Sequence, residues 1–61
     1  MTYLEYRHEI ITALNPHYID KLDEQLFIDV ENGALTFDEF LELSRMCNDR
    51  HSYHARMGVY A

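Results

Sequence analysis

The stretch Asn32-Gly33-Ala34-Leu35-Thr36-Phe37-Asp38-Glu39-Phe40 decides the fold, because it carries signals for the end of one helix and the start of another. Gly33 accepts a positive φ without steric cost, which suits the position just after a helix C-terminus, and Asn32 tolerates similar geometry. Thr36 and Glu39 have the spacing of a capping box, in which each side chain bonds the other residue's backbone N–H. We therefore predict a helix-turn-helix-like corner at residues 32–36.

Upstream of the corner, the sequence predicts a helix over residues 16–31. Asn15 is a good N-cap, and Pro16 has the φ angle that the first helical position requires. Apolar residues then recur every three or four positions, which is typical of an amphipathic helix. The predicted buried stripe is Ile19, Leu22, Leu26 and Val30, and the residues predicted to face water are Asp20, Asp23, Glu24 and Glu31.

A further helix is predicted over residues 2–14. Thr2 and Glu5 form a second capping box at its start. Asn15 ends it, since a residue before proline is biased away from helical geometry. Its apolar positions fit spacing by threes and fours and are Tyr3, Tyr6, Ile10, Ala13 and Leu14.

Downstream of the corner, a long helix is predicted over residues 36–57, and a frayed tail from Asn48, where the pattern turns polar, is the alternative. No proline or glycine interrupts this range, and Gly58 supplies a stop signal. One side of this helix is expected to carry Phe37, Phe40, Leu41, Ser44 and Cys47. Its distal half has no evident packing partner in so short a chain, which predicts a homodimer.

The whole pattern predicts an all-α fold of three helices in a single domain, residues 1–61, with fraying from residue 58. A core of this size rarely supplies more than about 3–5 kcal/mol. The single cysteine, Cys47, excludes an intrachain disulfide and suits a reducing cytoplasm. No apolar run approaches the roughly 20 residues of a membrane span.

The net charge of −6 is distributed unevenly. Residues 20–42 contain eight acidic residues and one lysine, whereas residues 43–61 contain three arginines and one aspartate. An acidic surface repels nucleic acids and anionic membranes, so charge argues against both as direct partners. A protein, basic in character, is the expected partner.

The corner also resembles the second half of an EF-hand calcium loop, with Gly33 at the sixth position and Glu39 at the twelfth. The first and third positions would be Ile28 and Val30, which offer no side-chain oxygen. Because calcium takes 6–8 oxygen ligands, a capped helical corner is favoured over a metal loop.

A DNA-binding helix-turn-helix is a second alternative for the corner. A recognition helix presents donors to bases and phosphates near its N-terminus, whereas this one begins with Asp38, Glu39 and Glu42 among apolar residues. Any DNA contact would have to come from the arginines of the C-terminal tail.

Cys47, His51 and His54 follow one another at i, i+4 and i+7 and would share one helix face. All three are zinc-ligand types. Three ligands from one helix close a tetrahedron poorly, so a buried cysteine beside surface histidines is favoured, and no metal or other cofactor is predicted.

The acidic residues are the best candidate for a functional surface. They recur one helical turn apart on each of two predicted helices, and the two rows could lie side by side near the corner. An ordinary solvated face is the alternative. The predicted protein-binding residues are Asp20, Asp23, Glu24, Asp38, Glu39 and Glu42.

In size, acidity and the runs Met1-Thr2-Tyr3-Leu4-Glu5-Tyr6-Arg7 and Asn32 to Phe40, the chain resembles small early proteins of lambdoid phages encoded between the exonuclease and excisionase genes. The resemblance implies a non-enzymatic accessory protein of lytic development, cytoplasmic in the bacterial host. Such a protein would modulate host or phage gene expression by binding a host or phage protein. The alternative is a DNA-contacting or metal-supported helical module that uses the basic tail.

Overall fold

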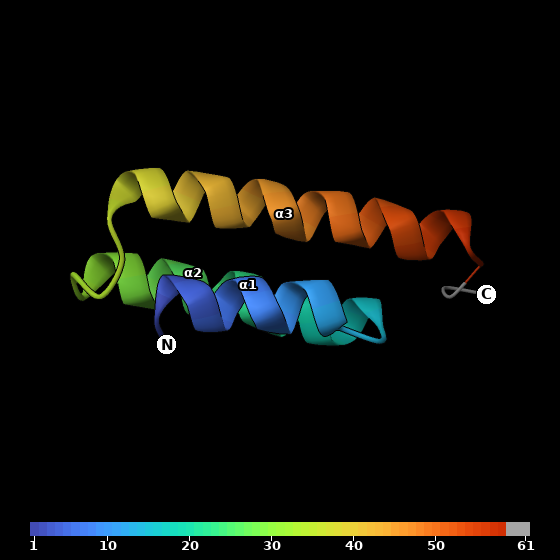
Figure 1. Ribbon diagram of the computed structural model, residues 1–61, viewed down its shortest axis with the longest axis horizontal. Coiled ribbons are helices and arrows are strands. Elements are labelled where there is room, and N and C mark those ends of the chain that lie inside the picture. The colour runs from blue at the N-terminus through green and yellow to red at the C-terminus, as the bar shows by residue number, and fades with distance from the viewer. Residues whose placement is uncertain (59–61) are drawn as a thin grey trace.

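The structure is a computed structural model, and it describes residues 1–58. It contains three helices, α1 (Tyr3–Thr12), α2 (Pro16–Glu31) and α3 (Phe37–Arg56), and no strand within residues 1–58. Consecutive helices are antiparallel, and α3 lies along the pair formed by α1 and α2 (Figure 1). The predicted all-α three-helix architecture is confirmed. The fraying expected from residue 58 concerns mainly residues 59–61, which lie outside the described part.

The corner between α2 and α3 has the predicted caps. Gly33 has a φ of 79°, its N–H bonds the carbonyl of Val30, and the N–H of Ala34 bonds the carbonyl of Asp29 at 2.8 Å. These two bonds form a Schellman motif, which satisfies carbonyls that the helix end leaves free. At the start of α3, Thr36 and Glu39 form a complete capping box.

Helix α1 ends two residues earlier than predicted. Ala13 is its C-cap and has an extended backbone, with a φ of −61° and a ψ of 129°. This bend keeps Ala13 in the core and leaves Leu14 85% exposed. The prediction that Leu14 belongs to the helix was therefore wrong, because the connection to Pro16 begins before the apolar pattern ends.

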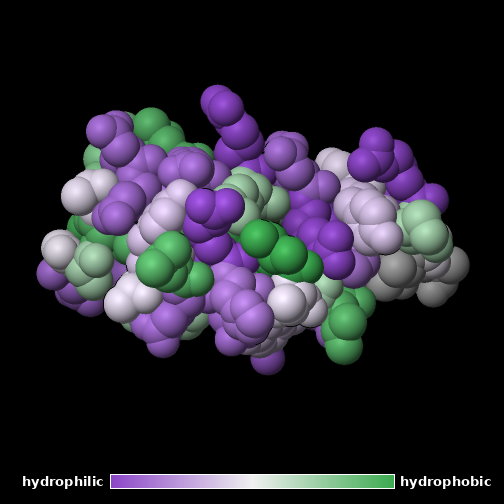
Figure 2. Space-filling model, in the orientation of Figure 1, coloured by the Kyte–Doolittle hydropathy of each residue, from purple (hydrophilic) through white to green (hydrophobic). Residues whose placement is uncertain are grey.

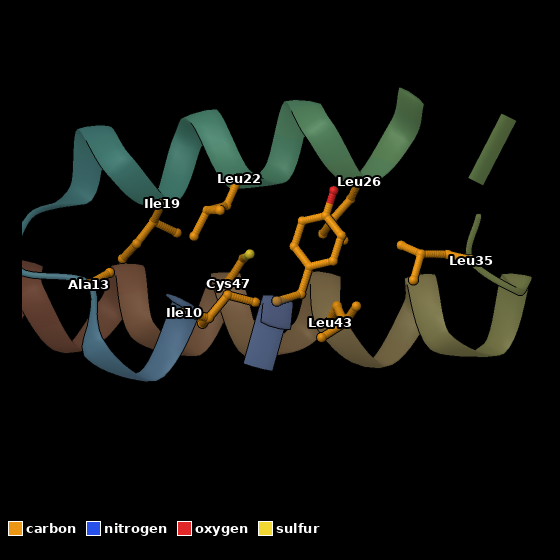
Figure 3. Close-up of a cluster of buried hydrophobic side chains, with 9 residues drawn as sticks. Ile10, Ala13, Ile19, Leu22, Leu26, Leu35, Leu43 and Cys47 are labelled. Atoms are coloured by element: carbon orange, nitrogen blue, oxygen red, sulfur yellow. The ribbon is translucent and has the colours of Figure 1, made fainter. Parts of the chain in front are cut away.

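The hydrophobic core lies where the three helices meet. In Figure 3, side chains of α2 point toward Leu43 and Cys47 of α3, with Ile10 of α1 close by. Tyr6, Leu26 and Leu43 are completely buried. The buried apolar residues are Tyr6, Ile10, Ala13, Ile19, Leu22, Leu26, Leu35, Leu43 and Cys47.

Two predicted faces are rotated relative to the core. On α2, Asp29 is buried where Val30 was predicted, because Asp29 faces the hydroxyl of Tyr6. On α3, Phe37 and Leu41 are 65% and 50% exposed, although both were predicted on the cysteine side of the helix. Helix α3 contacts α1 on one flank and α2 on the other, so its most buried positions fall between the two flanks.

The distal half of α3 packs within the chain. His54 is 5% exposed, and its Nε2 lies 3.1 Å from the carbonyl oxygen of Ala13. His51 Nε2 lies 2.9 Å from Oδ1 of Asp20 on α2. The reason for expecting a homodimer therefore does not hold, and dimerisation stays a prediction without that support. The assumption that both histidines lie on the surface was wrong for His54.

Candidate functional site

The acidic residues singled out from the sequence lie in two separate places. Asp20, Asp23 and Glu24 are in the first half of α2, whereas Asp38, Glu39 and Glu42 are in the first two turns of α3. Because α2 and α3 are antiparallel, the α2 carboxylates lie opposite the distal half of α3 (Figure 1). At 1.5 Å per residue, Glu39 is about 18 Å along α3 from His51, the partner of Asp20. The two rows are not side by side.

The carboxylates on α3 are partly engaged within the fold. Glu39 accepts a hydrogen bond from the N–H of Thr36 at 2.9 Å in the capping box. Glu42 accepts a hydrogen bond from the Tyr3 hydroxyl of α1, which raises the pKa of Tyr3. Asp38 is exposed in the first turn of α3, where a negative charge interacts favourably with the helix dipole. Of these three residues, Asp38 is exposed and takes no part in the capping box or in the contact with Tyr3.

The carboxylates on α2 border a hollow between α2 and α3. We call this hollow, of about 550 Å³, the carboxylate pocket, and its lining residues are Ile19, Asp20, Asp23, Ser44, Arg45, Cys47, Asn48 and His51. Glu24 is exposed one residue beyond it. Asp20 is paired with His51, but Oδ1 of Asp23 is buried without a hydrogen-bond partner.

Asp23 is the electrostatically unusual residue of the pocket. Burial raises the pKa of its carboxyl group, the negative charge of Asp20 raises it further, and His51 partly offsets the increase by lowering it. A buried carboxylate without a hydrogen bond is unfavourable when ionised. Asp23 is therefore a carboxylate that a cationic group could stabilise.

An exposed apolar surface adjoins this pocket. We call it the apolar patch and define it as Phe27 of α2 with Phe37, Phe40 and Leu41 of α3. The Phe40 ring lies 5.0 Å from the Phe27 ring and 6.1 Å from the Phe37 ring, between ring centroids. Phe27 is 55% exposed and Phe37 is 65% exposed. Aromatic groups left in water at a helix junction are typical of interaction sites.

Other exposed apolar residues are more scattered. Figure 2 shows the side of the molecule on which α1 lies in front, and there hydrophobic residues are dispersed among hydrophilic ones. Leu4 and Ile11 of α1 are 71% and 54% exposed. Single exposed apolar side chains are common on soluble proteins. The clustered rings of the apolar patch are the stronger candidate.

The apolar patch was not predicted from the sequence as a site. Phe37, Phe40 and Leu41 were predicted on one side of their helix, but no prediction joined them to Phe27 of α2. Its position follows α2 Asp23 by four residues, so it lies one turn along the same flank. This spacing was a signal that the patch and the carboxylates share a face.

Cys47, His51 and His54 have three different environments. Cys47 is buried in the core, His51 is paired with Asp20, and His54 bonds the Ala13 carbonyl. Within residues 1–58, no group of three metal-ligand side chains is close enough together to hold a metal ion. None of the three helices in this range is long and apolar enough to cross a bilayer.

No protein-family model, curated protein or solved structure matches this chain.

Proposed function

We propose that the chain is a small non-enzymatic regulator that acts by binding another protein through the outer face of α2 and α3. The observation that carries the proposal is the apolar patch, in which Phe27 and Phe37 remain more than half exposed on either side of the Phe40 ring. Large aromatic side chains dominate binding energy at protein interfaces when a partner covers them.

The charge around the patch supports a basic partner. Glu24 and Glu31 lie one turn to either side of Phe27 on α2, and Asp38 follows Phe37 on α3. All three are exposed. Charges at the rim of an apolar contact favour encounter with a partner of opposite sign. The resemblance to early lambdoid phage proteins suggests the setting, in which that partner is a host or phage protein that controls gene expression.

The test is affinity capture from lysate of the bacterial host, with quantitative mass spectrometry, comparing three forms of the chain. The patch variant carries Phe27→Ser and Phe37→Ser. The matched control carries Leu4→Ser and Leu14→Ser, which remove two exposed apolar side chains of α1 and the following connection. We expect a defined protein to be recovered with the wild type and the control and lost with the patch variant.

Circular dichroism would first show that all three forms are helical. Recovery of the same protein by the patch variant would overturn the proposal. A charge-reversed form, Asp38→Lys with Glu31→Lys, would test the rim. Glu39 is left unchanged, because it caps α3 and its loss would disturb folding.

A further inference from the structure

The apolar patch lies one helical turn from the carboxylate pocket on both α2 and α3, and we call the two together the groove. Asp23 precedes Phe27 by one helical turn on α2, and Ser44, which lines the pocket, follows Phe40 by one turn on α3. Side chains one turn apart have Cβ atoms about 6 Å from each other. A single ligand can therefore contact the rings at one end and the carboxylates at the other.

The carboxylate pocket contains a buried polar atom without a hydrogen-bond partner. Oδ1 of Asp23 is buried without a partner, beside Asp20. The group that contacts Asp20 is the imidazole of His51, which also lines the hollow, and Arg45 is an exposed member of the lining. The hollow of about 550 Å³ has room for the end of a long side chain. A guanidinium group suits this place, because its fork of donors can serve two carboxylates at once.

We propose that the partner docks as an amphipathic helix, with its apolar anchors on the patch and an arginine in the carboxylate pocket against Asp23 and Asp20. This inference rests on the proposed function. A groove between two helices is a common receptor for a helix that presents anchors at i, i+3 or i+4, and i+7. Asp20 and Phe27 are seven residues apart on α2, or about 10 Å. On the partner helix, the arginine should therefore lie about seven residues from the apolar anchor that contacts Phe27.

A second copy of the same chain fits this face less well. The groove and its rim carry five carboxylates, compared with one arginine, and a second copy would bring the same charges. The carboxylates are Asp20, Asp23, Glu24, Glu31 and Asp38, and the arginine is Arg45. Like charges placed together oppose association.

The experiment uses three synthetic 20-residue helical peptides and the full chain labelled with ¹⁵N. The first peptide carries two leucines four residues apart and an arginine seven residues from the first leucine. The second replaces the arginine by citrulline, which keeps its shape and removes its charge. The third replaces both leucines by serine. Binding is measured by chemical-shift titration, which gives both the site and the affinity.

We expect the first peptide to shift the amides of the pocket and the patch, and the citrulline peptide to bind about three- to tenfold more weakly. In Asp23→Asn, the difference in affinity between the two peptides should shrink, because the variant removes one of the two carboxylates that the arginine contacts. Asp49→Asn is the matched control, since it removes an exposed carboxylate of α3 that does not line the pocket. It should keep the difference between the peptides.

Each of the other outcomes would contradict one specific part of the proposal. Equal binding of the arginine and citrulline peptides at the patch would show that the pocket does not recognise an arginine, and the proposed function would be unaffected. Shifts that depend on protein concentration without peptide would identify a second copy as the occupant of the groove. No shift in the groove at millimolar peptide would overturn helix docking, and lysate capture with the patch variant would then decide the proposed function separately.

Discussion

The hydroxyl of Tyr6 on α1 donates a hydrogen bond to Oδ2 of Asp29 on α2, and both side chains are buried. The Nε2 of Gln25 donates to the other oxygen, Oδ1, at 3.1 Å, and the amino group of Met1 lies 3.4 Å from Oδ2. Burying a carboxylate is costly unless its oxygens accept hydrogen bonds. This network therefore fixes how α1 sits on α2, and it uses one of the few polar groups in the core.

We predict that Tyr6→Phe lowers the free energy of unfolding by about 1–3 kcal/mol, because it leaves a buried carboxylate oxygen short of a hydrogen bond. The measurement is urea denaturation followed by circular dichroism. Such a loss is a large part of the stability of a chain this small.

Tyr18→Phe is the matched control for this prediction. The hydroxyl of Tyr18 also donates to a carboxylate, that of Glu9, but at the surface. Its loss is expected to leave the urea midpoint almost unchanged, because water replaces the bond. Equal effects of the two substitutions would show that the Tyr6 to Asp29 contact has no special role.

The caps at the corner between α2 and α3 could be predicted from the sequence because local residues determine them. Gly33, Thr36 and Glu39 each act within a few positions of their own backbone. Asp29 was missed because a carboxylate was expected to face water. Its spacing of three from Leu26 and seven from Leu22 placed it on the buried stripe, and only the partner hydroxyl of Tyr6, 23 residues away, explains why it can be there.

The candidate site was harder to predict because it depends on how the helices are rotated. The contact between Asp20 and His51 spans 31 residues of sequence, and no local pattern encodes it. The acidic residues were selected from the sequence because they are acidic. In the structure, however, Glu39 belongs to the capping box of α3 and Glu42 interacts with Tyr3. The aromatic rings could be recognised as one surface only from the structure, which shows which sides of α2 and α3 lie together.

Acid should destabilise the fold partly through Asp29. The hydrogen bond from Tyr6, and then that from Gln25, holds the pKa of Asp29 below its ordinary value of 3.8. A lowered pKa in the folded state contributes stability above the unfolded pKa, and this contribution is lost as pH falls through the folded value. We expect the free energy of unfolding to fall below about pH 4.

A comparison of the wild type with Tyr6→Phe tests whether Asp29 is responsible for the loss of stability in acid. The variant lacks the main cause of the lowered pKa, so its stability should fall less steeply between about pH 4 and pH 2. Urea titrations at several pH values measure both slopes. Identical slopes would assign the acid sensitivity to other carboxylates, such as Glu5, whose pKa is lowered by the backbone of Thr2.

Asp23 should respond to pH in the opposite sense. Its pKa is raised mainly by burial, so the ionised form opposes folding above the folded pKa, and the penalty is relieved as pH falls through that value. We predict that Asp23→Asn unfolds at a higher urea concentration than the wild type at pH 7, and that this advantage disappears at pH 3. Asp49→Asn, at an exposed position, should show no such advantage. A less stable Asp23→Asn at pH 7 would mean that its carboxylate has a stabilising partner.

Cys47 is predicted to be unreactive in the folded protein. Burial raises the pKa of its thiol to about 12, and the charges of Asp23 and Asp20 add to this effect. Because the thiolate is the nucleophile, iodoacetamide at pH 8 should label the native chain about 100-fold more slowly than the chain in urea. Mass spectrometry of timed samples measures the ratio. Rapid labelling of the native chain would show that the α2 and α3 interface opens readily.

Gly33 closes the corner between α2 and α3 with a φ of 79°. A Cβ built at this position meets no atom within 4 Å, so any effect of a side chain comes from the backbone alone. Gly33→Ala should cost about 1–2 kcal/mol, and Gly33→Asn less, because asparagine tolerates left-handed geometry. A chain of 61 residues is accessible to chemical synthesis, which permits d-alanine at the same position. Since d-alanine favours positive φ, that form should be at least as stable as the glycine form in urea. If l-alanine and d-alanine gave equal midpoints, the corner would not depend on the left-handed backbone, and the Schellman motif would not be what ends α2.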